Sequence, residues 1–128
     1  MFPIILTDNG SEFSDPVAIE TSPFTGELRT RVFYCDPNAS WQKGRIENNH
    51  TNLRRILIKG CSFNRLTQND INLVLSHLNS YIRKSYDDIP AISKFCALFG
   101  DDCLDIFNLE IISPDEVILD PKLLKGKI

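Results

Sequence analysis

A short apolar run that stops at an acidic residue constrains the fold of this chain more than any other feature. Residues 2–6 are all apolar, and after a single threonine the turn-forming sequence Asp8-Asn9-Gly10 follows. An apolar run of this length, bounded by a turn, is typical of a buried strand. The pattern therefore predicts a strand over residues 3–7 with an aspartate at its carboxyl end.

Further strand and helix signals follow this run. Residues 11–20 predict a short helix. Residues 29–35 are rich in β-branched and aromatic side chains, which favour a second strand. A turn comes next, and a helix is expected over residues 39–58 with Ser40 as its N-cap.

The second half of the chain predicts helices and then an arm. Thr67 and Asp70 resemble a capping box, and the apolar residues behind them have helical spacing. Pro90 is suited to open a shorter helix, and Gly100 is suited to end it. We therefore expect helices over residues 68–84, 90–99 and 101–107, followed by short strands or an extended arm over 108–128.

The composition is that of one soluble domain. Of the 128 residues, 42% are hydrophobic and 24% are charged, which suffices for a moderate core. No apolar run is long enough to cross a membrane, and no basic region precedes an apolar stretch, so a cytoplasmic location is expected. The four cysteines form no C-x-x-C pair and are expected to be reduced thiols.

The charge of the chain is unevenly distributed. The net charge is −3, which by itself argues against extensive binding of nucleic acid. Residues 43–59, however, hold five basic residues against the single acid Glu47. The basic charge is therefore concentrated on the predicted helix 39–58. A solvated helix face is the alternative explanation for this charge.

Glu47 lies where its carboxylate is able to meet that of Asp8. The α-helical period places Lys43, Glu47 and Arg54 on one stripe of the predicted helix. Glu47 then sits at the edge between core and solvent. Hard divalent cations prefer carboxylate oxygens, so two acids that converge from a strand end and a helix predict a metal site. The neighbouring stripe, expected to face the core, holds Ile46, Leu53 and Leu57.

At these residues the chain resembles the DDE transposases of bacterial insertion sequences. The resemblance is greatest to the IS30 family, which shares its catalytic core with retroviral integrases. It covers roughly residues 3–100 and rests on blocks in the same order. They are Thr7-Asp8-Asn9-Gly10 with Phe13, Asp36-Pro37 with Ser40-Trp41, and Gly44-Arg45-Ile46-Glu47-Asn48 with Arg54.

The resemblance implies an α/β, ribonuclease-H-like fold and catalysis with two Mg²⁺ or Mn²⁺ ions held by three acids. Asp8 matches the second acid, at the end of the fourth strand, and Glu47 matches the third, on a helix. Both are thus implied catalytic residues and metal ligands. The implied activity is DNA transposition and integration, by cleavage of phosphodiester bonds and strand transfer.

The resemblance also implies contacts with DNA. Arg54 matches a basic residue that approaches donor DNA, and Lys43 and Arg55 are further candidates for binding phosphates. Asn9 and His50 are candidates for groups that support the metal ligands. The implied partners are the transposon ends, the target DNA and other copies of a full-length transposase; no membrane partner is implied.

Part of the family pattern is missing from this sequence. The first acid of the family lies on the first strand of its fold, whereas the chain matches the pattern only from the fourth strand onward. We therefore expect a partial, helix-rich core over residues 1–100 and a C-terminal extension over 101–128. The chain alone is expected to be inactive. The alternative function is that of a catalytically inactive remnant which only binds DNA or dimerises.

Simpler structural roles are the alternatives for several residues. Asp8 is also suited to cap the turn at Gly10, and Glu47 is also explained as a solvated helix acid. Residues 47–50 spell E-x-x-H, the half-site of di-iron helix bundles, but no second copy accompanies it. Structural roles are expected for Glu12 and His50 at the surface and for His77 near the rim of its helix. Phe13 and Trp41 are expected in the core, with stacking on nucleobases as the alternative.

Overall fold

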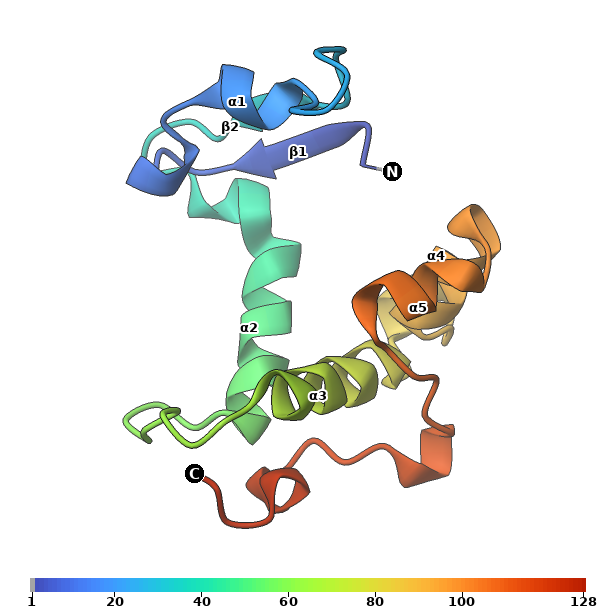
Figure 1. The fold of residues 1–128 in the computed structure, drawn as a ribbon. Helices are drawn as coiled ribbons and strands as arrows, with labels where there is room; N and C mark the ends of the chain where they lie inside the picture. Colours follow the sequence, from blue (N-terminus) through green and yellow to red (C-terminus); the bar gives the residue numbers. More distant parts are fainter. Residues whose placement is uncertain (1) are drawn as a thin grey trace. The chain divides into compact units, whose positions relative to one another are not determined.

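The computed structural model describes residues 2–128, apart from the side chains of Ser40, Arg45 and Ser85. The chain forms two compact units that divide inside a helix, after Glu47. Helices outweigh strands in the described part of the chain (Figure 1), in agreement with the predicted α/β, helix-rich class. None of the helices formed by the described residues is both long and apolar enough to cross a bilayer.

The first unit contains a small parallel sheet. Strand β1 (Ile4–Thr7) pairs with β2 (Arg31–Tyr34), so both expected strands are confirmed. Figure 1 shows the two strands side by side, with α1 (Pro16–Glu20) in the crossover between them. Parallel strands need such a crossover because the chain must return to the same end of the sheet. The register aligns the last residue of β1, Thr7, with the last residue of β2, Tyr34.

Side-chain hydrogen bonds fasten the crossover to β2. The carboxylate of Glu20, at the end of α1, accepts a hydrogen bond from the backbone N–H of Val32 at 2.8 Å. The hydroxyl of Tyr34 donates to the backbone carbonyl of Phe13. Phe13 is half-buried. The crossover therefore contacts both the middle and the end of β2.

The expected helix 39–58 is shorter and begins differently. A 3₁₀ helix, Ser40–Lys43, leads into α2 (Gly44–Ile56), and the N-cap is Ala39 instead of Ser40. Trp41 is 77% exposed, so its predicted core position is wrong. Trp41 lies in the 3₁₀ helix, before the α-helical part of the segment begins at Gly44.

The core of the second unit is built by α2, α3 and the C-terminus. Four buried aliphatic side chains form it: Ile56, Val74, Leu123 and Leu124. Leu53 and Leu57 pack against this cluster as expected, whereas Ile46 is 40% exposed. The apolar stripe of α2 is therefore buried only in the last turns of the helix.

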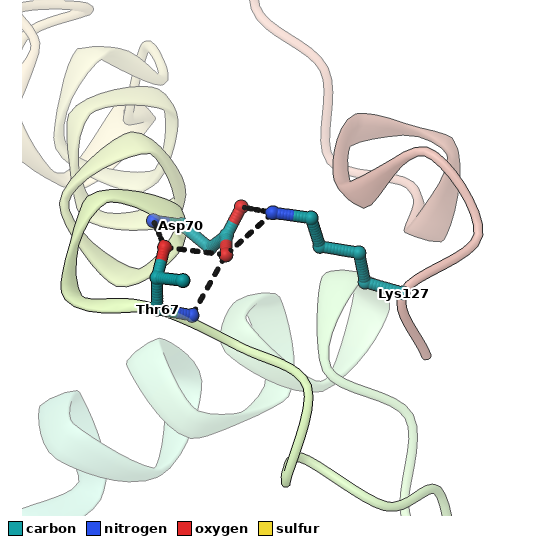
Figure 2. A network of polar contacts seen from close by, with 3 residues as sticks. All are labelled: Thr67, Asp70 and Lys127. Atoms are coloured by element: carbon teal, nitrogen blue, oxygen red, sulfur yellow. Dashed lines mark hydrogen bonds and ion pairs between the residues drawn. The ribbon is translucent and has the colours of Figure 1, made fainter.

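Helix α3 (Gln68–Ser80) begins with the predicted capping box. The N–H of Asp70 donates to the Thr67 hydroxyl at 3.3 Å, and the N–H of Thr67 donates to the Asp70 carboxylate at 2.7 Å. Lys127 adds an ion pair to both oxygens of Asp70, at 2.6 and 2.8 Å (Figure 2). The helix ends four residues before the expected position because Tyr81 is already extended.

The expected arm is confirmed, and within the described residues it forms no strand. Residues 110–118 run along α3, and three backbone N–H groups of this segment donate to buried side chains of the helix. Glu110 donates to the Ser76 hydroxyl at 3.0 Å, Ile112 to the Ser80 hydroxyl at 3.0 Å, and Ile118 to Nδ1 of His77 at 3.1 Å. These side chains satisfy backbone groups that a sheet would otherwise pair.

Two further helices form a second cluster. Helix α4 (Ala91–Phe99) ends at Gly100, whose φ of +83° suits glycine, and α5 (Asp102–Phe107) follows. Both helices match the expected positions. The cluster contains Ile92, Cys103 and Leu104 as its buried members.

The ion pair at the start of α3 predicts a specific acid sensitivity. Lys127, followed by the Thr67 hydrogen bonds, lowers the pKa of Asp70 to about 2. The lowered pKa adds stability above about pH 4, and this stability is lost as the pH falls towards 2. In urea denaturation, Asp70→Asn should lower stability near neutral pH and flatten the profile in this window. Asp115→Asn, on the exposed arm, should leave the profile unchanged.

His77 predicts a second pH dependence. Burial lowers its pKa, and the nearby charge of Glu116 opposes the shift. Because the neutral ring accepts the N–H of Ile118, stability should be full above about pH 6.5 and should fall as the pH drops below it. Thermal unfolding of His77→Asn, which keeps an acceptor, should lose this dependence. The exposed His50→Asn control should retain it; an unchanged profile in His77→Asn would contradict the assignment.

Candidate metal site in the first unit

The parallel pairing of β1 and β2 brings two turns to one edge of the sheet. Asp8 follows β1, and Cys35 and Asp36 follow β2. The pairing extends past the strands, since the N–H of Cys35 donates to the carbonyl of Thr7 at 2.8 Å. The side-chain amide of Asn9 donates to the carbonyl of Cys35 at 3.5 Å. Asn9 therefore links the two turns.

Both carboxylate oxygens of Asp8 have partners. One accepts the N–H of Gly10 at 3.2 Å, which confirms the turn contact considered as an alternative role. The other accepts a hydrogen bond from Lys43 Nζ at 2.7 Å. These two interactions, Lys43 first, lower the pKa of Asp8. The carboxylate is therefore ionised at neutral pH, and its 56% exposed side chain is also stabilised in this form by water.

Asp8 and Glu47 line the same open hollow, of about 430 Å³. Glu47 lies in the first turn of α2, directly after the 3₁₀ helix that carries Lys43. The pKa of Lys43 is raised, first by its hydrogen bond to Asp8 and in smaller part by the charge of Glu47, while burial opposes the shift. The structure thus brings both sequence-predicted acids to one cavity. Its other lining residues are Asn9, Cys35, Asp36, Pro37, Asn38, Ala39 and Lys43.

A reciprocal contact between Asp36 and Gln42 positions the 3₁₀ helix. The N–H of Asp36 donates to Oε1 of Gln42, and Nε2 of Gln42 donates to the Asp36 carboxylate, both at 2.9 Å. Sequence reasoning missed this pair. The spacing of the two residues could have predicted it, because an acid and an amide six residues apart flank a turn. This turn contains Asn38, whose φ is +60°.

The remaining predicted residues lie elsewhere. Arg54 and Arg55 are exposed in the last turn of α2, where the helix dipole also favours positive charge. His50 is exposed on the same helix, and all three belong to the second unit. The carboxylate of Glu12 lies over Gly10. It is so close that a Cβ atom at residue 10 would be only 2.5 Å from it. None of these four residues lines the hollow.

The donor set of the hollow suits a hard cation but is small. Asp8 and Glu47 supply carboxylate oxygens, which Mg²⁺ and Mn²⁺ prefer. The ammonium of Lys43 already occupies a place beside Asp8, so this position attracts positive charge. Among the described residues, however, no group of three or more His, Cys, Asp and Glu side chains is arranged to hold a metal ion.

Comparison with known proteins identifies transposases as relatives. The chain is 30% identical over 91 residues to the transposase for insertion sequence element IS4351 of Bacteroides fragilis, covering 71% of the chain and 26% of that protein. It is 34% identical over 62 residues to transposase InsI for insertion sequence element IS30A of Escherichia coli, covering 48% and 16%. It is 33% identical over 91 residues to a putative integrase of Spiroplasma virus SpV1-R8A2 B, covering 71% and 27%.

The matched segments are short parts of these relatives. The chain spans about a quarter of the length of the Bacteroides fragilis protein and less of the Escherichia coli protein. No protein-family model and no solved structure matches the chain. The resemblance drawn from the sequence blocks is nevertheless confirmed: the chain is a relative of the transposases of bacterial insertion sequences, including those of the IS30 family.

Proposed function

We propose that the chain forms part of the catalytic core of a DDE transposase, with Asp8 and Glu47 as two of the metal ligands. One observation carries this proposal: in a relative of transposases, a strand-end acid and a helix acid line the same hollow. The proposed activity is DNA transposition by metal-dependent cleavage and strand transfer. Its substrates are then transposon ends and target DNA, and homo-oligomers are the expected assembly.

The residues of the hollow would hold Mg²⁺ or Mn²⁺ through Asp8 and Glu47. When bound, such ions activate an attacking hydroxyl and stabilise a leaving oxygen at phosphorus. The chain itself positions the ligands. Asn9 holds the Asp8 turn against the end of β2, and the Asp36–Gln42 contact holds the 3₁₀ helix that precedes Glu47.

The exposed apolar side chains of the sheet in the first unit favour the proposal that it belongs to a larger, ribonuclease-H-like core. Ile4, Leu6 and Phe33 are exposed on β1 and β2. Parallel strands normally belong to larger sheets whose faces are both covered. Two parallel strands with exposed apolar side chains are therefore expected to extend into a sheet with further strands. The first acid of the family pattern belongs, in this proposal, to such a strand.

The proposed DNA contacts are the basic residues of helix α2 and its entry. Arg54 and Arg55 are exposed and available to phosphates. Lys43 lies in the hollow, beside the position proposed for the metal ions. The exposed indole of Trp41 lies two residues before Lys43 and is suited to stack on a nucleobase.

A non-catalytic role is the second candidate function. The observation that favours it is the small ligand set, because the described residues hold no group of three metal-binding side chains. Asp8 is moreover engaged by Gly10 and Lys43. In this candidate the chain binds DNA or dimerises without cleaving DNA, and so interferes with a complete transposase.

Strand cleavage tests the catalytic proposal. The chain alone should not nick a labelled transposon-end duplex in Mn²⁺, because two carboxylates hold a metal pair poorly. Fusion to the preceding core segment of a homologous transposase should produce nicking. In this fusion, Asp8→Asn or Glu47→Gln should abolish nicking, whereas the control Glu12→Gln should not.

Two results would contradict the proposal. Nicking by the 128-residue chain that depends on Asp8 would show that another residue of the chain completes the metal site. A fusion that nicks equally well with Asp8→Asn would remove Asp8 from the metal site.

The salt dependence of DNA binding tests the basic helix. Each phosphate contact adds about one unit to the slope of log K against log salt concentration. Arg54→Ala should weaken binding by this fusion across all sequences and flatten the slope by about one unit. Arg65→Ala, an exposed arginine outside the helices, is the matched control. An unchanged slope for Arg54→Ala would leave Arg54 as a solvated helix residue.

A further inference from the structure

Lys43 occupies the part of the hollow that the proposed metal site would use. Its ammonium donates to Asp8 at 2.7 Å, and the charge of Glu47 acts on it as well. The Lys43 side chain is only 22% exposed, and both acids line the same hollow. One cationic group therefore faces the two carboxylates proposed as metal ligands.

We propose that Lys43 is a built-in counter-ion that competes with divalent cations for Asp8 and is displaced when they bind. The inference rests on the proposed function, since it concerns the same carboxylates. Asp8 has one oxygen on the backbone of Gly10 and the other on Lys43. A metal ion that approaches Asp8 meets the positive charge of Lys43, so both cations cannot hold this oxygen without strong repulsion.

The local structure reduces the entropy cost of forming the ion pair between Lys43 and Asp8. Exposed ion pairs between long side chains contribute little because ordering them costs entropy. Here the 3₁₀ helix that carries Lys43 is anchored by the two hydrogen bonds between Asp36 and Gln42. The backbone of Lys43 is therefore held beside the hollow before the ion pair forms.

Displacement gives Lys43 a second role. An ammonium released from Asp8 remains tethered beside the hollow and is then available to a phosphate oxygen. The same side chain thus neutralises Asp8 before metal binding and contributes to the DNA-binding surface afterwards. Competition is reciprocal: the factor by which Lys43 weakens metal binding equals the factor by which metal weakens the Lys43–Asp8 contact.

Mn²⁺ binding to the full 128-residue chain, followed by the electron paramagnetic resonance signal of free Mn²⁺, tests the competition. Lys43→Met should bind Mn²⁺ at least about fivefold more tightly than the parent chain. Lys59→Met removes the same charge from an exposed residue that does not line the hollow and should change affinity less than about twofold, because exposed charges are screened by salt. Asp8→Asn should weaken Mn²⁺ binding in both the parent and the Lys43→Met backgrounds.

A second measurement needs no substitution of Lys43 in the protein observed, because a methylated lysine keeps its positive charge. After reductive ¹³C-methylation of the lysines, Mg²⁺ should move the Lys43 methyl signal towards its position in Asp8→Asn. Lys43→Arg, which loses this signal, assigns it. A Lys43 signal that stays in place at saturating Mg²⁺ would overturn the competition, whether or not Lys43→Met folds.

The outcomes separate this inference from the proposed function. If the parent chain binds Mn²⁺ through Asp8 but Lys43→Met binds no more tightly than Lys59→Met, only the competition is overturned. If no variant shows binding that depends on Asp8, both the competition and the metal-ligand role of Asp8 fall. Tighter binding by Lys43→Met together with a moving Lys43 signal establishes the competition.

Discussion

The first unit depends on the parallel pairing of two short strands. Because β1 and β2 run in the same direction, their carboxyl ends lie at one edge, and the turns after Thr7 and Tyr34 meet there. Asn9 links the turns, and the contact of Asp36 with Gln42 directs the chain into the 3₁₀ helix and α2. The neighbourhood of Asp8, Lys43 and Glu47 follows from this pairing, which brings Asp8 to residues at least 35 positions further along the chain.

In the second unit, side chains of helix α3 accept backbone hydrogen bonds from the C-terminal arm. Ser76, His77 and Ser80 of α3 accept the backbone N–H groups of the arm, and Lys127 binds the acid that caps the same helix. Leu123 and Leu124 then complete the core that Ile56 and Val74 begin. The C-terminal segment is therefore part of the packing of this unit. Its attachment depends on side chains that titrate, so acid should loosen it.

Local signals in the sequence were sufficient for most elements. The apolar run before Asp8, the capping box of Thr67 and the glycine at position 100 each act within a few residues, and each placed one end of its element correctly. Errors arose where neighbours in space decide. Trp41, expected in the core, lies exposed in a 3₁₀ helix, and Ile46, expected to face the core, is 40% exposed.

The sequence by itself determined which side chains are available and that the chain is related to transposases, because the motifs around Asp8 and Glu47 are local patterns of residue type. The tertiary structure alone decided that these two acids line one hollow. It also decided that Asp36 and Gln42 bind each other beside it and that Lys43 forms an ion pair with Asp8. Spacing along a chain does not specify which distant groups meet. The physical reason is that strand pairing and a 3₁₀ turn, set by backbone hydrogen bonds, fix where each charge lies.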